Sequence, residues 1–146
     1  MRRTTQRLAL LAAAGLGLWL PGCGGRYHKL PETGATLEGT VTYGKDKLEV
    51  ALVIIQGQGA AQTALIGEDG RYKAENVPLG EVHLGVNTEA GKGQMMGPMM
   101  AKAQGKAQGP MPKIIDVPAK YANPDTSGIT TTVNKGENTF DIVIPK

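Results

Sequence analysis

Short segments in which apolar and polar residues alternate dominate the chain from Leu37 onward. Residues 37–43 form the first such segment, and residues 48–56 form a second that is richer in β-branched residues. Alternation places successive side chains on opposite faces of a strand, whereas an amphipathic helix repeats every 3.6 residues. The second segment is also short and bounded by glycines, which argues against a helix. The pattern therefore predicts strands.

Turn-forming residues separate these segments at short intervals. Asp69-Gly70 supplies the positive φ that a tight hairpin needs, and Pro78 and Gly80 stand in turn-compatible places. Strands are expected at residues 37–43, 48–56, 62–66, 71–74, 82–86, 129–133 and 138–144, with a short ordered return at 113–117. About seven short strands without a helix pattern predict an all-β fold, a single antiparallel Ig-like sandwich.

One segment, residues 89–112, interrupts this pattern. It consists almost wholly of Gly, Met, Gln, Ala, Lys and Pro and contains no branched aliphatic residue. Such a composition is expected to bury too little apolar area to offset roughly 1–2 kcal/mol of backbone ordering per residue. The sequence thus predicts a long mobile loop between two strands, rich in glycine, methionine and lysine.

The N-terminal 22 residues have the three parts of a secretory signal. Arg2, Arg3 and Arg7 are followed by 13 residues without charge, from Leu8 to Leu20. A helix of that length covers about 20 Å of a ~30 Å hydrocarbon core, so it is short for a membrane span. We expect residues 1–22 to be a signal peptide that is removed.

The signal ends at the single cysteine of the chain, Cys23. Leu20-Pro21-Gly22-Cys23 resembles a bacterial lipobox, which implies cleavage before Cys23 and attachment of lipid, including acyl chains such as palmitate, to that residue. Several acyl chains on one residue make release from a membrane slow. Residues 23–35 then form a tether, and Gly24, in place of a retention aspartate, favours the outer membrane, on its periplasmic or surface face. The alternative is an ordinary cleaved signal that leaves Cys23 as a free thiol.

Charge excludes one class of partner once the signal is removed. The three signal arginines leave with it, so 13 basic residues remain against 13 acidic ones. Nucleic-acid binding through a general basic field therefore has no support. We expect the partners to be the membrane, through the lipid on Cys23, and an unidentified envelope protein or polymer.

Several short motifs carry a family resemblance by their order and spacing. They lie at residues 39–44, 69–72, 76–80, 118–128 and 136–141. Together they resemble the carboxypeptidase regulatory-like, or transthyretin-like, β-sandwich, including a bacterial lipoprotein subgroup of it. The resemblance implies that residues 36–146 form one such domain and that the domain carries no catalytic residue. It also implies that Tyr72 and Tyr121 are packed.

Residues with catalytic potential are scattered along the sequence. Ser127 is the only serine, and neither His28 in the tether nor His83 on an expected strand lies near it in sequence. Such a nucleophile needs a base, and the base needs a neighbour to orient it. Glu68, Asp69 and Asp116 are carboxylates from which an acid–base pair could be drawn, but nothing singles out a pair. We expect no enzymatic activity and no cofactor.

Two alternative functions remain open. Within the segment 89–112, Met95, Met96, Met99, Met100 and Met111 offer soft thioether ligands for Cu(I) in a periplasmic copper-binding module. Against this, the lysines of the segment make it locally cationic, and methionine also suits a flexible insertion with unspecific apolar contact. A carbohydrate-binding accessory domain is the third possibility, although exposed aromatic platforms are few. The preferred interpretation is a non-enzymatic, membrane-anchored envelope lipoprotein that presents a β-sandwich for protein or envelope-surface contact.

Overall fold

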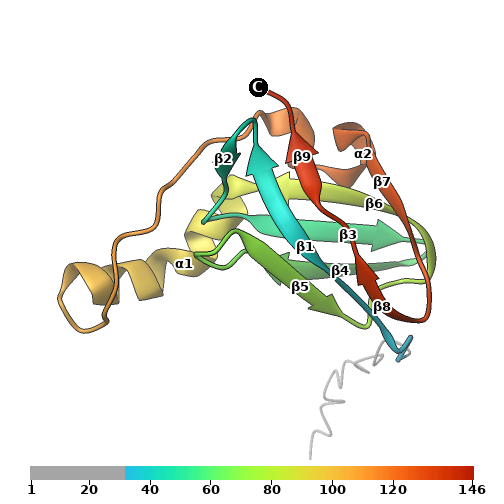
Figure 1. Cartoon of the computed structure of the whole chain (residues 1–146), viewed down its shortest axis with the longest axis horizontal. Helices are drawn as coiled ribbons and strands as arrows, with labels where there is room; N and C mark the ends of the chain where they lie inside the picture. Colours follow the sequence, from blue (N-terminus) through green and yellow to red (C-terminus); the bar gives the residue numbers. More distant parts are fainter. Residues whose placement is uncertain (1–31) are drawn as a thin grey trace, which may run out of the picture.

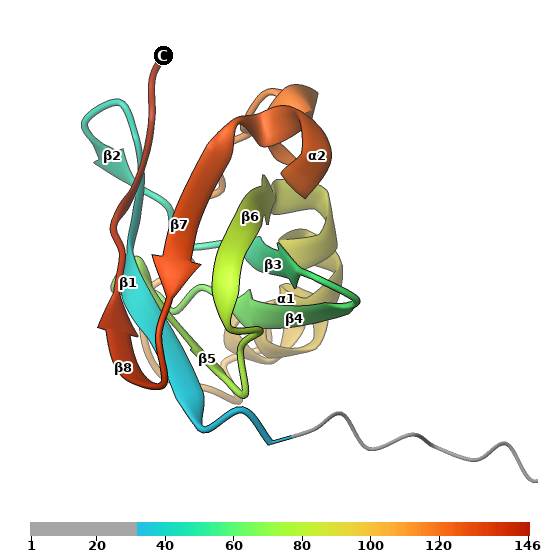
Figure 2. The same cartoon turned by 90° about the vertical axis from the view of Figure 1, so that its right-hand side faces the viewer.

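The chain folds into two stacked β-sheets, seen edge-on in Figure 2 and face-on in Figure 1. The computed structural model describes residues 32–146. The expected signal peptide, Cys23 and His28 lie outside the described residues, as does most of the expected tether.

The first sheet is built around strand β1 (Ala35–Tyr43). Antiparallel strands β5 (Arg71–Glu75) and β2 (Asp46–Lys47) pair along one side of β1. Along its other side lie β8 (Gly136–Thr139) and β9 (Ile142–Ile144), both parallel to β1.

The second sheet is antiparallel throughout and has the order β4-β3-β6-β7. Its strands are β3 (Leu52–Gly57), β4 (Ala60–Leu65), β6 (Gly80–Asn87) and β7 (Ile129–Val133). Strand β3 is apolar along much of both faces, which agrees with its central place and its β-branched sequence. His83 points outward from β6, as the alternation predicts.

The core lies between the two sheets. Leu37 and Val41 of β1 alternate inward and are almost completely buried, as are Val53 and Ile55 of β3. Tyr72 and Tyr121 are also buried, which confirms the expectation that both are packed. The predicted all-β sandwich is therefore correct.

Within residues 32–146 the sandwich has nine strands and a mixed first sheet, not seven strands in an antiparallel arrangement. The last predicted strand, 138–144, is divided into β8 and β9 at Phe140 and Asp141. Opposite this break, a Cβ added to Gly39 would lie 2.0 Å from the Phe140 carbonyl oxygen, so only glycine allows the two chains to approach there. Nothing in the alternation of a strand reports whether its partner runs parallel or antiparallel.

The prediction of a mobile loop is wrong for residues 89–103, whereas residues 104–112 contain no regular secondary structure. Residues 88–103 form a helix, α1 (Thr88–Ala103), and its N-terminus is capped by the Asn87 side chain, which accepts a hydrogen bond from the Ala90 amide at 2.9 Å. Met, Ala, Lys, Gln and Glu are good helix formers, and this propensity outweighs the glycines. Residues 113–117, predicted as a short ordered return, contain no regular secondary structure, and Ile115 and Val117 pack partly against the core.

Helix α1 docks on the sandwich through its first half only. Thr88, Gly91 and Met95 face the sandwich and are buried. Gly91 lies so close to the backbone of Ala51 that an added Cβ would be 2.4 Å from the Ala51 Cα. The second half of α1 projects from one end of the sandwich, and residues 104–118 return from its tip (Figure 1). We call residues 88–118 the methionine arm.

The connection from 118 to 128 folds into two short helical turns, η1 (Ala119–Tyr121) and α2 (Pro124–Ser127). Pro124 packs against Gly85 on the outer face of β6. Among residues 32–146, no helix has the length and apolar character needed to cross a membrane.

Candidate functional site

Two hollows in the described part of the chain merit comparison as sites. One is a polar cleft on the outer face of the first sheet, and the other is an apolar hollow beside α1. They differ in the residues that line them and in how the sequence places those residues.

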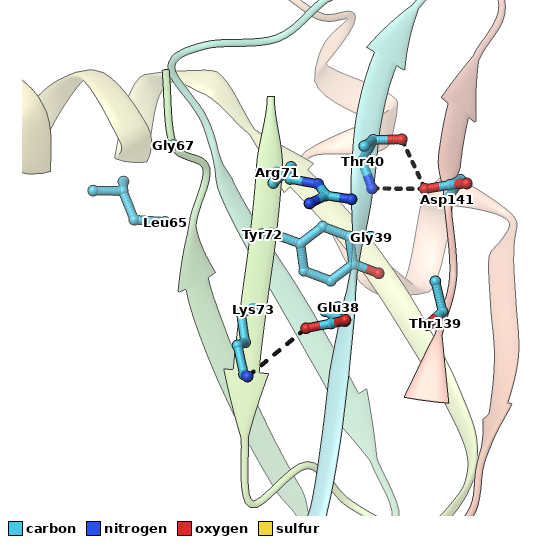
Figure 3. A pocket seen from close by; sticks show the side chains of 10 residues that line it. All are labelled: Glu38, Gly39, Thr40, Leu65, Gly67, Arg71, Tyr72, Lys73, Thr139 and Asp141. Atoms are coloured by element: carbon cyan, nitrogen blue, oxygen red, sulfur yellow. Dashed lines mark hydrogen bonds and ion pairs between the residues drawn. The ribbon is translucent and has the colours of Figure 1, made fainter. Parts of the chain in front are cut away.

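The polar cleft lies on the outer face of β1 and β5, as Figure 3 shows, and encloses about 550 Å³. Alternation brings Glu38 and Thr40 of β1 to this face, together with Arg71 and Lys73 of β5. Lys73 Nζ lies 3.8 Å from a carboxylate oxygen of Glu38. Glu38 and Lys73 are thus a cross-strand pair of opposite charge on a solvated sheet face.

Asp141 closes the far side of the polar cleft at the break between β8 and β9. Its Oδ1 atom accepts hydrogen bonds from the Thr40 amide and the Thr40 hydroxyl, each at 2.7 Å (Figure 3). These hydrogen bonds, with a smaller contribution from the charge of Arg71, lower the pKa of Asp141. The carboxylate therefore stays ionised at neutral pH and replaces the missing strand carbonyl opposite Thr40.

This geometry suits a structural role for the polar groups of the cleft. The Thr40 hydroxyl donates to Asp141, whose lowered pKa makes it a weak general base. Tyr72 donates its hydroxyl proton to the Phe140 carbonyl oxygen at 2.8 Å, and burial raises the pKa of this phenol. No catalytic role follows from these contacts.

The scattered residues with catalytic potential are not brought together by the fold. The buried Ser127 hydroxyl donates to the Leu84 carbonyl oxygen and accepts from the Ile129 amide at 3.1 Å, so it fixes the turn before β7. His83 Nε2 lies 3.7 Å from Glu81 on an exposed face.

The three carboxylates singled out in the sequence likewise serve separate contacts. Glu68 pairs with Lys102, Asp69 accepts from the Arg71 amide at 3.1 Å, and Asp116 pairs with Lys92 at 2.5 Å. Residues 32–146 contain no group of three or more His, Cys, Asp or Glu side chains placed to hold a metal ion.

The apolar hollow lies between α1 and the returning chain and encloses about 380 Å³. Its lining is almost wholly apolar: Lys92, Met96, Met99, Met100, Ala103, Met111 and Ile114. We call it the methionine hollow. The fold thus brings together four of the five methionines that the sequence singled out as metal ligands, while Met95 is buried against the sandwich.

The positive charge expected for the arm is largely offset, because three of its four lysines, Lys92, Lys102 and Lys113, pair with acidic residues. Lys92 Nζ lies 2.7 Å from Glu89 and 2.5 Å from Asp116, and these carboxylates raise the pKa of the Lys92 ammonium group. Lys102 pairs with Glu68, and Lys113 lies 3.5 Å from Asp46. Most of these carboxylates lie far from the lysines in sequence, so a local count of charge missed them.

Two hydrogen bonds flank Met111 and fix the returning chain, one to α1 and one to Glu49. Lys102 Nζ donates to the Pro110 carbonyl oxygen at 3.0 Å, and the Lys113 amide donates to Glu49 Oε2 at 2.6 Å. Pro112, between them, is buried. Sequence reasoning missed this arrangement, although the spacing of Thr88, Gly91 and Met95 by three and four residues was the available signal for a docked helix.

Comparisons with known proteins add little to the geometry. No family model and no curated protein matches the chain. Among solved structures, the Bacillus anthracis TIE protein is similar, with a TM-score of 0.42 and 15% identity over 76% of this chain and 16% of that chain. The chain spans less than a fifth of the length of that protein, and the similarity goes no further than a strand-rich fold.

Proposed function

We propose that this chain is a non-enzymatic, lipid-anchored lipoprotein of the cell envelope, attached through Cys23 and presenting a β-sandwich for contact with protein or with the envelope surface. The observation that best supports the proposal is where the sandwich begins. Strand β1 starts at Ala35, only 12 residues after Cys23, and is the central strand of its sheet. A lipid on Cys23 would therefore hold the sandwich close to the membrane.

We further propose that the sandwich is of the carboxypeptidase regulatory-like kind. The resemblance in sequence supports this assignment, and so does the packing of Tyr72 and Tyr121, which lie in two of the resembling motifs. The absence of a matching family model leaves the assignment to rest on those motifs.

An edge of the second sheet offers a surface for protein contact. Strand β4 pairs with β3 along one side and ends the sheet on the other. Its residues, Ala60–Leu65, include no charged side chain. An uncharged edge strand is a ready template for pairing with an extended segment of another chain.

Replacement of the cysteine tests the anchoring. In a bacterial host with two membranes, the wild-type chain is expected in the outer-membrane fraction with lipid on the mature N-terminus, detected by mass spectrometry. Cys23→Ser should be recovered in the soluble periplasmic fraction or as uncleaved precursor. Gly24→Ala is the matched control, because it changes the neighbouring residue and keeps the cysteine. An unmodified thiol on Cys23 of the mature wild-type chain would refute the proposal.

A second candidate function, periplasmic copper binding, is favoured by one specific observation. Four thioether side chains that are spread over 16 residues of sequence line a single hollow. The carbohydrate-binding alternative gains no comparable support, because Tyr72 and Tyr121 are buried and Tyr43 and Phe140 pack partly against the core.

A further inference from the structure

The methionine hollow has the composition of a soft-metal site. We propose that it binds Cu(I) through thioether sulfur atoms of Met96, Met99, Met100 and Met111, with no histidine, cysteine or carboxylate ligand. The inference deepens the copper-binding candidate function and does not depend on lipid at Cys23. It assigns the ligands, the oxidation state of the metal and the way the site is held in shape.

The helix supplies three of the four donors. Met96 and Met100 are four residues apart and Met99 is three from Met96, so the three side chains lie on one side of α1 within about one turn. Met96 and Met100 are 60% and 57% exposed, so their thioethers are accessible to a ligand from solution. Met95, one residue earlier, points into the sandwich and is 9% exposed.

The returning chain supplies the fourth donor from across the hollow. Met111 is 54% exposed, and its backbone is fixed on both sides by the hydrogen bonds of Lys102 to Pro110 and of Lys113 to Glu49. Donors from two segments therefore face one space before any metal arrives. Such preorganisation lowers the entropy cost of binding.

The donor set selects for a soft monovalent ion. Thioethers are soft, uncharged ligands that suit Cu(I), whereas Mg²⁺ and Ca²⁺ prefer oxygen and Zn²⁺ prefers thiolate, imidazole or carboxylate. The one charged group in the lining, Lys92, is offset by Glu89 and Asp116. A single positive charge can therefore enter the hollow without facing an uncompensated ammonium group.

Thioether coordination has a consequence that other donor sets lack. Cysteine and histidine must lose a proton before they bind a metal, so their affinities fall as the pH is lowered. Methionine has no proton to lose. The affinity of this hollow for Cu(I) should therefore be nearly constant between pH 7 and pH 5.

The test is an anaerobic titration with Cu(I) against a chromophoric Cu(I) chelator. The full chain is used in detergent with Cys23→Ser in every sample, so that a free thiol cannot contribute. The site variant is Met96→Leu/Met100→Leu/Met111→Leu. Leucine keeps the apolar surface and approximate volume but removes the sulfur. The matched control is Met95→Leu, the same change at the adjacent, buried position.

We expect one Cu(I) per chain at micromolar dissociation constant or tighter, a loss of about 100-fold or more in the site variant, and a change of less than about 3-fold in the control. Circular dichroism and a hydrophobic dye report whether the site variant keeps the fold and the hollow. Binding weaker than micromolar in the parent chain would overturn the proposal. Equal Cu(I) affinities of the parent chain and the site variant would also overturn it. If both chains bind the hydrophobic dye and neither binds Cu(I), the hollow is an apolar docking surface only, and the proposal is likewise overturned. None of these results bears on lipid attachment to Cys23.

Discussion

The sandwich and the methionine arm are held together in different ways. In the sandwich, side chains from both sheets meet in one continuous core, and the large aliphatic residues of β1, β3 and β6 are almost fully buried. The arm has fewer buried residues: Thr88, Gly91 and Met95 of α1 and Pro112 of the returning chain. Ile115 and Val117 pack only partly against the core, and ion pairs and hydrogen bonds hold the far end of the arm.

This difference implies unequal local stability. Regions with few buried apolar contacts open at lower free energy than a packed core. The sandwich is therefore expected to unfold as one unit, while the arm opens separately and its methionines remain adaptable. The stable sandwich thus carries a less stable, methionine-rich arm. Substitutions in either region can test this difference in stability.

The largest effect is expected in the sandwich, at the break between β8 and β9. Gly39→Ala would place a methyl group 2.0 Å from the Phe140 carbonyl oxygen, so the two chains must separate. We expect a loss of roughly 3 kcal/mol or more in the free energy of unfolding, measured by urea denaturation. Gly93→Ala in the arm, where an added Cβ meets nothing within 4 Å, is the control. An unchanged midpoint for Gly39→Ala would mean that the core does not depend on this contact.

Docking of the arm depends on a second glycine. Gly91→Ala would bring a methyl group within 2.4 Å of the Ala51 Cα and should displace α1 at a cost of about 1–3 kcal/mol. Hydrogen exchange should then accelerate in residues 88–103 while the strands keep their protection. Gly93→Ala, two residues away, should instead stabilise the helix by about 0.5–1 kcal/mol. Equal acceleration in the arm and in β3 would show that the two regions open together.

The far end of the arm depends on Lys102. Replacing it in Lys102→Gln removes the ion pair with Glu68 and weakens the hydrogen bond to the Pro110 carbonyl oxygen. We expect faster exchange in residues 104–113 with a change of about 1 kcal/mol or less in global stability. Lys106→Gln, an exposed lysine four residues later, serves as the control and should leave exchange unchanged. If hydrogen exchange in residues 104–113 is the same in the two variants, Lys102 does not hold the far end of the arm in place.

The smallest effect is expected in the dependence of stability on acidic pH, through Asp141. The pKa of Asp141 is lowered in the folded chain by the hydrogen bonds from Thr40, so its contribution to stability is present above the unfolded value of 3.8 and is lost as the pH falls toward the folded value. Asp141→Asn should therefore flatten the fall in stability below about pH 4. The flattening is partial, because the pKa of Asp46 is also lowered, by Lys146 and Lys113. The free energy of unfolding is measured from pH 5 to pH 2 for the wild-type chain and for Asp141→Asn, with Glu75→Gln on β5 as the control. Identical pH dependence in the wild-type chain and Asp141→Asn would contradict this role of Asp141.

The sequence predicted the sandwich well because alternation is a local signal of strand and of burial. The expected segments at 37–43, 71–74 and 129–133 correspond closely to β1, β5 and β7. The parallel placement of β8 and β9 was missed, because the identity of a strand's partner depends on residues about a hundred positions away. Gly39 and Asp141, which form the break, carry no local signal of their pairing.

The methionine arm was mispredicted for a different physical reason. The argument from composition counted branched aliphatic residues, whereas α1 needs only Thr88, Gly91 and Met95 to dock, and glycine at 91 allows a close approach instead of weakening the helix. The sequence singled out the methionines as soft donors, and four of the five line one hollow, but metal binding by them stays a prediction. The sequence could not separate Met95 from the four methionines that line the hollow, because that separation depends on the helix. The ion pairs of the lysines could not be predicted either, because they depend on the tertiary fold.

The division of the methionines is the central claim of this account, and methyl NMR tests it most directly. With ¹³C-labelled methionine methyl groups assigned by single Met→Leu substitutions, the chain carrying Cys23→Ser is titrated with Ag(I), a redox-inert substitute for Cu(I). The account predicts that the signals of Met96, Met99, Met100 and Met111 shift together at one equivalent while the buried Met95 signal stays in place. Equivalent, sharp methyl signals from Met95 and these four residues that shift in parallel would contradict it, because they would show a mobile loop without an ordered helix or a defined hollow.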